Sequence, residues 1–143
     1  MSEQGIPKGY QTITPYISVK GARGFLNFLK KAFQAEEVEV SAGEDGTIYN
    51  AEVRIGTSML FAADCRDMQP RPCTIYMYVT DPDALYASAL AAGAKSIAPM
   101  TDQFYGDRVG AVEDTWGVQW WIAKRVKQVA PEEIARMKDE KRK

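Results

Sequence analysis

A short pattern that occurs twice along the chain sets the strongest limit on its fold. Thr14-x-Tyr16-x-x-Val19 returns sixty residues later as Thr74-x-Tyr76-x-x-Val79. Each copy leads into an apolar helical stripe and then into three strand-like stretches. A period of about 60 residues is longer than the repeats of solenoid proteins. The repeat therefore predicts an α+β fold of two βαβββ modules, whose sheets form one curved, partly open, mixed β-barrel with flanking helices.

Hydrophobic periodicity places the elements of both modules along the chain. The strands are expected at 12–19, 37–41, 48–55, 58–63, 74–79, 95–100, 108–114 and 118–124. The helices are expected over 21–33, from Asp81-Pro82 to Gly93, and from Pro131 onward. Asp45-Gly46 is typical of a hairpin turn, and residues 64–72 are expected to form a linker. The first module then covers about 10–64, the second about 73–125 and the C-terminal helix about 131–141, within a single domain.

The composition narrows the classes of function. A hydrophobic fraction of 45% and a charged fraction of 26% are typical of a soluble globular protein. A formal net charge of −1 offers no basic surface for nucleic acid, and no apolar run approaches the roughly 20 residues of a membrane span. Without a secretion signal, the cytoplasm is the expected compartment. The chain has no histidine, which removes the commonest metal ligand and general base.

The parity of the strands divides each sheet into two faces. The aliphatic face, which the helices should cover, carries Ile13, Ile17, Val19, Ile75, Met77, Val79, Val118, Trp120 and Ile122. The opposite face carries Thr14, Tyr16, Ser18, Thr74, Tyr76, Tyr78, Gln119 and Trp121, with Asn50, Glu52 and Arg54 on the same side. Such a surface is rich in aromatic rings and sparsely polar, as small-molecule pockets are. For its aromatic side chains, pocket lining competes with a packed barrel interior or a dimer interface.

Two longer motifs carry a resemblance to a known family. They are Asp102-Gln103-Phe104-Tyr105-Gly106-Asp107-Arg108 and Asp114-Thr115-Trp116-Gly117-Val118-Gln119-Trp120-Trp121. Both are similar to motifs of the PhnB-like branch of the vicinal-oxygen-chelate superfamily, which includes glyoxalases, bleomycin-resistance proteins and extradiol dioxygenases. The resemblance spans residues 12 to about 137. It implies the two-module fold, and a barrel face that holds either a divalent metal or a small molecule without one.

The same resemblance indicates that the metal ligands are missing. Alignment of the two modules puts the first-strand ligand positions on Thr14 and Thr74, and the last-strand positions near Phe61 and Trp121. None of these is a usual ligand of a divalent metal. Related PhnB-like sequences often carry histidine where Asn50 and Val118 stand here. No metal and no other cofactor are therefore expected.

The preferred hypothesis is a binding protein for a small hydrophobic or aromatic molecule, with no catalytic residues. The expected ligand-binding residues are Tyr16, Asn50, Glu52, Phe61, Thr74, Tyr76, Tyr78, Tyr105, Arg108 and Trp121. The alternative is a lyase, isomerase or dioxygenase-like enzyme that uses either a metal held by Glu52, Asn50 and water or a metal-free acid/base site. A third hypothesis is a protein that acts through protein contacts, its pocket filled by its own tyrosines. A homodimer is expected, because exposed sheet edges need cover.

Two charged pairs have a structural and a functional interpretation. Glu52 with Arg54 is expected to be a solvated charge pair of little energetic weight, and a role of Glu52 as acid, base or metal ligand is the alternative. Asp107-Arg108, directly after Gly106, is expected to form a turn with a structural ion pair. Binding of a substrate anion by Arg108 is the alternative there.

Overall fold

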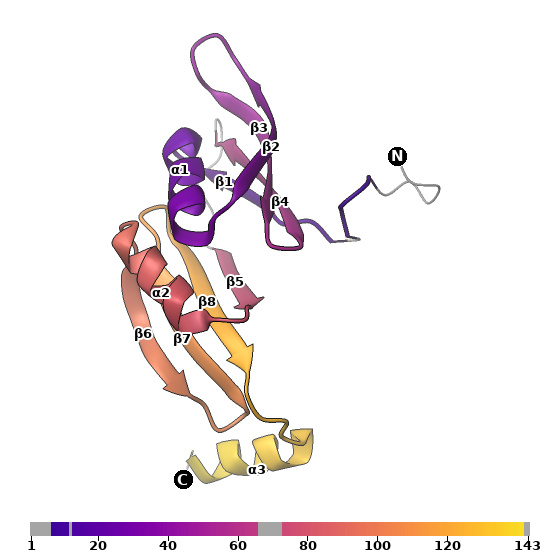
Figure 1. The fold of residues 1–143 in the computed structure, drawn as a ribbon, viewed down its shortest axis with the longest axis vertical. Coiled ribbons are helices and arrows are strands. Elements are labelled where there is room, and N and C mark those ends of the chain that lie inside the picture. Colours follow the sequence, from indigo (N-terminus) through magenta and orange to yellow (C-terminus); the bar gives the residue numbers. More distant parts are fainter. Residues whose placement is uncertain (1–6, 12, 66–72, 142–143) are drawn as a thin grey trace. The chain divides into compact units, whose positions relative to one another are not determined.

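The computed structural model describes residues 7–11, 13–65 and 73–141. The chain divides into two compact units, residues 1–73 and 74–143 (Figure 1). Each unit contains one strand, one helix and three further strands in that order, and the second unit adds a C-terminal helix. The predicted α+β class and the two βαβββ modules are therefore confirmed. Within the described residues, no helix has the length and apolarity that crossing a membrane requires.

The first module is a four-stranded sheet with one helix. Its elements are β1 (Tyr16–Val19), α1 (Ala22–Phe33), β2 (Glu36–Ala42), β3 (Ile48–Ile55) and β4 (Ser58–Asp64). The strand order is β1-β4-β3-β2, with β1 parallel to β4 and the other neighbours antiparallel. The hairpin turn between β2 and β3 is the one that Asp45-Gly46 predicts, with Gly46 at φ 89°.

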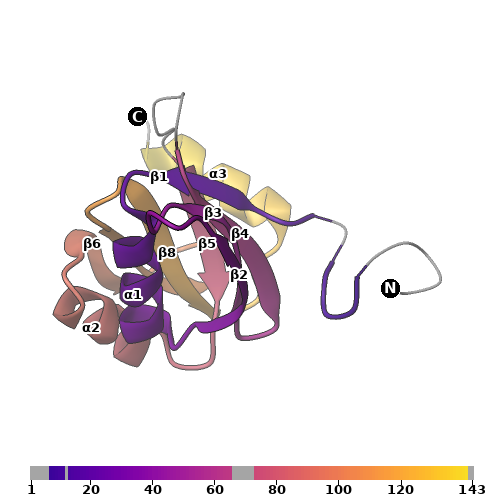
Figure 2. The same ribbon diagram turned by 90° about the horizontal axis from the view of Figure 1, so that it is seen from above.

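Helix α1 covers one face of this sheet (Figure 2). Its predicted apolar stripe of Phe25, Leu29, Ala32 and Phe33 is buried, and each of these side chains is at most 4% exposed. The carboxylate of Asp64, at the end of β4, fixes the start of the helix: it accepts 2.8 Å hydrogen bonds from the backbone N–H groups of Ala22 and Ile48. One side chain thereby joins α1, β3 and β4.

The first strand is shorter than predicted. It begins at Tyr16 and not at Thr12, and Thr12 itself lies outside the described residues. Ile13, expected in the aliphatic core, precedes the strand and is 83% exposed. Pro15 accounts for this start, because proline has no N–H to give to a ladder. Its carbonyl makes the first contact with β4 by accepting from the N–H of Phe61.

The second module repeats the arrangement. Its elements are β5 (Cys73–Tyr78), α2 (Pro82–Ala91), β6 (Lys95–Asp102), β7 (Asp107–Glu113) and β8 (Val118–Arg125), followed by α3 (Pro131–Lys141). The strand order is β5-β8-β7-β6, and α2 packs on β7 and β8. Asp81 begins α2 as an N-cap, accepting from the N–H of Ala84 at 3.2 Å. The predicted linker falls mainly on residues 66–72, outside the described residues.

The two consecutive tryptophans of β8 point to opposite faces, as predicted. Trp120 lies in the core at 1% exposure, and its indole Nε1–H donates to buried Asp114 at 2.9 Å. Asp114 also accepts from the backbone N–H groups of Trp116 and Val118, which closes the turn between β7 and β8. Trp121 is half-buried on the other face.

The edge strands of the two modules share an irregularity. Glu37 and Glu39 of β2 pair with the consecutive residues Val53 and Glu52, so Val38 is an extra residue in the ladder. In β6 the same shift occurs between Ser96 and Ala98, which makes Ile97 the extra residue. Both side chains are 44% exposed. The repeat therefore extends to a β-bulge at the equivalent position of each edge strand.

Candidate functional site

Two tyrosine rings lie together on the second sheet, on the face that points away from α2. We call the faces that point away from α1 and α2 the helix-free faces. Tyr76 and Tyr78 are two residues apart on β5, so both side chains point to one face. Their ring centroids are 5.4 Å apart at an interplanar angle of 57°. The two residues are 43% and 57% exposed, and they form an accessible aromatic surface.

A buried carboxylate holds both tyrosines in place. Asp107, the first residue of β7, is 2% exposed. Its Oδ2 atom accepts hydrogen bonds from the hydroxyl groups of Tyr76 and Tyr78, at 2.7 and 3.0 Å. Each tyrosine therefore has its hydroxyl fixed at the sheet while its ring remains accessible.

Arg125 completes this cluster from β8. Its Nε atom donates to Oδ1 of Asp107 at 2.5 Å, and its Nη2 atom donates to the hydroxyl oxygen of Tyr78 at 2.9 Å. The guanidinium carbon also lies 5.6 Å from the centroid of the Tyr78 ring, within the range of a cation–π contact. Asp107 and Arg125 are direct partners in the β7–β8 ladder, so the backbone register brings them together.

The electrostatics of the cluster keep Asp107 ionised. Burial alone would raise the pKa of Asp107, but hydrogen bonds from Arg125, Tyr76 and Tyr78 outweigh it, and the net pKa lies below the usual value. The pKa of Tyr76 is raised by burial, by its bond to Asp107 and by a hydrogen bond with Tyr105. The Tyr76 hydroxyl group therefore stays protonated at neutral pH and serves as a donor to the carboxylate.

Trp121 lies on the same helix-free face, and its neighbours on β7 and β6 are small. It pairs with Ala111 of β7, which is followed across the sheet by Ala98 of β6. Thr74 lies on this face of β5 by the same parity as Tyr76, and it is exposed. Tyr105, in the turn before β7, is half-buried and packs edge-on against Phe104 with a centroid distance of 5.3 Å.

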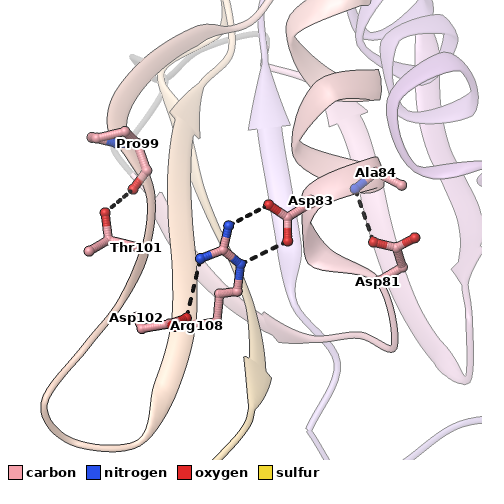
Figure 3. Close-up of polar contacts among 7 residues, drawn as sticks. All are labelled: Asp81, Asp83, Ala84, Pro99, Thr101, Asp102 and Arg108. Atoms are coloured by element: carbon pink, nitrogen blue, oxygen red, sulfur yellow. Dashed lines mark hydrogen bonds and ion pairs between the residues drawn. The ribbon is translucent and has the colours of Figure 1, made fainter.

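Arg108 lies on the opposite face of β7, beside α2. Its Nε and Nη2 atoms donate to the two carboxylate oxygens of Asp83 at 2.9 and 2.7 Å, and Nη1 donates to Asp102 at 3.2 Å (Figure 3). Asp107 and Arg108 both form structural ion pairs, but with other partners, and the predicted turn is wrong, because the two residues begin β7. The Arg108 ion pairs join α2, β6 and β7, and they leave Arg108 away from the tyrosines.

The helix-free face of the first sheet carries aromatic rings next to acidic residues. Tyr16 pairs with Phe61, Phe61 with Glu52, and Glu52 with Glu39, in one row across all four strands. Phe61 has its ring centroid 6.2 Å from that of Tyr16 and 5.6 Å from that of Tyr10. Asn50 lies on the same face of β3, opposite Ser41, and is half-buried.

Glu52 and Glu39 form a pair of like charges within this row. The hydroxyl group of Tyr10 donates to Oε1 of Glu52, and Glu52 is hydrogen-bonded to Glu39. That bond and the negative charge of Glu52 raise the pKa of Glu39. Burial and the contact with Glu52 raise the pKa of Tyr10 to about 12. Arg54 forms its ion pair with Glu36 at 3.5 Å, so the charge pair with Glu52 expected from the sequence is replaced by other partners.

The structure thus divides the predicted site residues among three places. Tyr76, Tyr78, Thr74, Trp121 and Tyr105 belong to the second module's helix-free face and to the turn beside it. Tyr16, Asn50, Glu52 and Phe61 lie on the helix-free face of the first module, and Arg108 lies beside α2.

Sequence reasoning did not place four residues in these clusters, namely Tyr10, Glu39, Asp107 and Arg125, and it gave Asp107 only a structural ion pair in a turn. The alternation of side chains along β7 and β8 could have indicated Asp107 and Arg125. It places Asp107 and Arg125 on the face of Trp121, where charged side chains are unusual among aromatic rings.

Comparison with known proteins identifies the family. The sequence model of the Glyoxalase/Bleomycin resistance protein/Dioxygenase superfamily matches residues 12–122. The chain belongs to this superfamily. An uncharacterized protein of Mycobacterium bovis is 34% identical over 134 residues, which cover 85% of this chain and 88% of that protein.

Solved structures of the superfamily fold agree with this assignment. TioX from Micromonospora sp. ML1 matches with a TM-score of 0.66 at 18% identity, over 80% of this chain and 99% of that one. A PhnB protein from Bacillus cereus, described as a putative 3-demethylubiquinone-9 3-methyltransferase, matches with a TM-score of 0.60 at 20% identity, over 78% and 97%. The predicted superfamily is confirmed, and a PhnB-like protein is among the structures that share its fold.

The residues of this superfamily member do not fit a metal centre of the usual kind. Over residues 7–11, 13–65 and 73–141, no group of three or more Asp, Glu, Cys or His side chains is placed to hold a metal ion. The aligned ligand positions carry Thr14, Phe61, Thr74 and Trp121, which supply two hydroxyl groups and two apolar rings. Glu52, the carboxylate nearest to this set in the ladder, is engaged with Tyr10 and Glu39.

Proposed function

We propose that the protein binds a small hydrophobic or aromatic molecule on the helix-free face of its second module. The observation that carries this proposal is the pair of exposed rings, Tyr76 and Tyr78, anchored by the buried Asp107. Offset and edge-to-face ring contacts contribute about 0.5–1.5 kcal/mol beyond the area they bury. The superfamily includes bleomycin-resistance proteins by name, which is consistent with a binding role.

The hydrogen bonds that anchor the tyrosine hydroxyl groups favour ligand binding. They already restrict the two side chains, so less conformational entropy is lost when a ligand binds. Immobilising a free side chain costs about 0.5–1.5 kcal/mol at an interface. Tyr76 and Tyr78 are already fixed through Asp107, and on the β7 and β6 side of Trp121 the row carries only the methyl groups of Ala111 and Ala98. A planar ligand can therefore contact rings that are held in place before it arrives.

Calorimetric titration with 2-naphthalenemethanol, a neutral aromatic compound, tests the proposal. Tyr78→Ala is expected to weaken binding about tenfold because a stacking surface is lost. Tyr78→Phe keeps the ring and is expected to weaken it less. Tyr86→Ala is the matched control, since Tyr86 lies on α2 with its hydroxyl group bonded to Ser96. Binding that is unchanged in the Tyr76→Ala/Tyr78→Ala double variant would refute the proposal.

A second candidate function, acid/base catalysis, is favoured by one observation in the first module. Glu39 and Glu52 are hydrogen-bonded, and the raised pKa of Glu39 suits a carboxyl group that gives and takes a proton. The superfamily is named for glyoxalases and dioxygenases as well as for bleomycin-resistance proteins, so a carbonyl compound is the substrate class to test. Turnover of such compounds that is abolished in Glu52→Gln, but retained in Glu44→Gln in the β2–β3 turn, would establish this function.

We also propose that the protein is a homodimer. The outer strands β2 and β6 each expose an apolar bulge residue, Val38 and Ile97, and exposed sheet edges favour association. Analytical ultracentrifugation tests this proposal. The double variant Val38→Lys/Ile97→Lys is expected to shift a dimer towards monomer, and a monomeric unaltered protein at all concentrations would contradict it.

A further inference from the structure

Arg125 is fixed at two of its nitrogen atoms, and its third is available. Nε is bound to Asp107 and Nη2 to Tyr78, and the guanidinium group lies over the Tyr78 ring. Within the described part of the chain, Nη1 has no recorded acceptor, and the Arg125 side chain is 44% exposed. The group therefore offers N–H donors in a defined direction beside the two tyrosine rings.

The donors and acceptors that the cluster of Tyr76, Tyr78, Asp107 and Arg125 leaves available determine which chemical groups can bind there. The hydroxyl protons of Tyr76 and Tyr78 are both directed to Asp107, so they are not available to a ligand. The donors that remain in this cluster are the N–H groups of Arg125. A ligand group placed beside Arg125 must therefore accept hydrogen bonds, and a carboxylate does so most strongly because it matches the planar guanidinium group.

The surrounding charges also favour an anion. Asp107 compensates the charge of Arg125, but it is buried, and the exposed part of the pair is the cation. The other carboxylate on this face of β7 is Glu113, six residues further along the strand. At about 3.3 Å per residue this is about 20 Å away, beyond the screening length of about 8 Å in physiological salt. Lys127, two residues after Arg125, is close enough to Glu133 of α3 for their charges to interact, so Arg125 alone is the cation expected to attract the anion.

We propose that the ligand of the second module is an aromatic carboxylate, whose ring contacts Tyr76 and Tyr78 and whose carboxylate binds Nη1 of Arg125. This inference rests on the proposed binding function and adds the charge of the ligand to it. Arg125 is then the residue that selects anionic over neutral aromatic compounds, and Asp107 is the positioning residue that orients it.

Three compounds with the same ring system and different charges test this proposal. They are 2-naphthoate, 2-naphthalenemethanol and 2-naphthylmethylamine, titrated by calorimetry at low and at physiological salt. The naphthoate is expected to bind about tenfold more tightly than the alcohol, which is the usual effect of a hydrogen bond to a charged group. This advantage should decrease with salt, and the amine should bind more weakly than the alcohol.

Variants of two arginine residues test whether Arg125 causes the preference for the naphthoate over the alcohol. Arg125→Gln is expected to remove the advantage of the naphthoate, measured as the ratio of the naphthoate and alcohol affinities of the same variant, whatever the change in the alcohol affinity itself. Arg108→Gln is the matched control, because Arg108 is an equally charged residue of the opposite face and should leave the preference unchanged. If Arg125→Gln does not fold, Arg125→Lys and naphthoate-induced shifts of the Arg125 Nε resonance in the unaltered protein give the same test.

The outcomes separate this inference from the proposed function. Equal affinity for all three compounds, with losses in Tyr78→Ala, would overturn the inference and leave the binding function intact. A naphthoate preference that persists in Arg125→Gln, or an Arg125 Nε resonance that does not shift, would also overturn it. Absence of binding for every compound would overturn both.

Discussion

Asp107 and Arg125 face each other in the β7–β8 ladder, and their ion pair is buried at one end and exposed at the other. The carboxylate is 2% exposed, whereas the guanidinium side chain is 44% exposed. This asymmetry gives the pair two roles: the carboxylate anchors two tyrosine rings, and the cation remains accessible.

The first prediction concerns the stability that Asp107 provides. Asp107→Asn keeps the shape of the side chain but cannot accept bonds from both tyrosines and Arg125 together. Because the partners are partly exposed and can bond to water instead, the free energy of unfolding should fall by only about 1–3 kcal/mol. Urea denaturation measures this change. Asp139→Asn, on an exposed part of α3, is the control and should have little effect.

The second prediction concerns acid stability. The pKa of Asp107 is lower in the folded protein than its ordinary value of about 3.9, so its ionised form favours folding. This contribution is present above that ordinary pKa and is lost as the pH falls through the lower folded value. The stability difference between the unaltered protein and Asp107→Asn should therefore narrow below about pH 4. A difference that stays constant from pH 7 to pH 3 would contradict the assignment.

The third prediction concerns the pair of glutamates in the first module. The pKa of Glu39 is raised in the folded protein, so the pair is least stable when both groups are ionised. Glu39→Gln should raise the thermal unfolding midpoint at pH 7. The gain should shrink as the pH falls through the raised pKa of Glu39, and it should be largely gone below the ordinary glutamate pKa of about 4.3, where Glu39 is protonated in the folded and the unfolded protein. Glu44→Gln, in the β2–β3 turn, should show no comparable pH-dependent gain.

The fourth prediction concerns the turn that places Asp107. Gly106 has φ 104°, and a Cβ atom added there would lie 2.1 Å from the carbonyl oxygen of Lys127. Gly117 has φ 88° with nothing within 4 Å of the added atom. Each alanine variant is destabilised by about 1–2 kcal/mol because alanine disfavours a left-handed backbone conformation. In Gly106→Ala the added Cβ atom also clashes with the backbone carbonyl of Lys127. Gly106→Ala should therefore unfold at clearly lower urea concentration than Gly117→Ala.

Much of the fold could be predicted because periodicity and repetition are local properties of the sequence. The stripe of Phe25, Leu29 and Phe33 predicted α1, and the alternation around Trp120 and Trp121 predicted the two faces of β8. The assignment of Ile13 to the core was wrong. The alternation of apolar and polar residues runs from Ile13 through Val19, but the ladder of β1 with β4 begins only after Pro15.

The candidate site was less predictable because its contacts join distant residues. Tyr76 meets Asp107 across 31 positions, and Arg125 meets it across 18. Glu39 meets Glu52 only because the bulge at Val38 shifts the register of the β2–β3 ladder. Parity assigns each side chain to a face, but it does not give the register that decides which of them touch.

The paired bulges at Val38 and Ile97 have a consequence for behaviour at high protein concentration. A growing amyloid ladder needs about six regularly spaced residues of extended backbone. The bulges divide β2 and β6 into segments shorter than this, so neither strand can template an added copy along its length. Duplication gave the chain a second outer strand of this kind, and the same backbone irregularity opposes fibril growth on β2 and on β6.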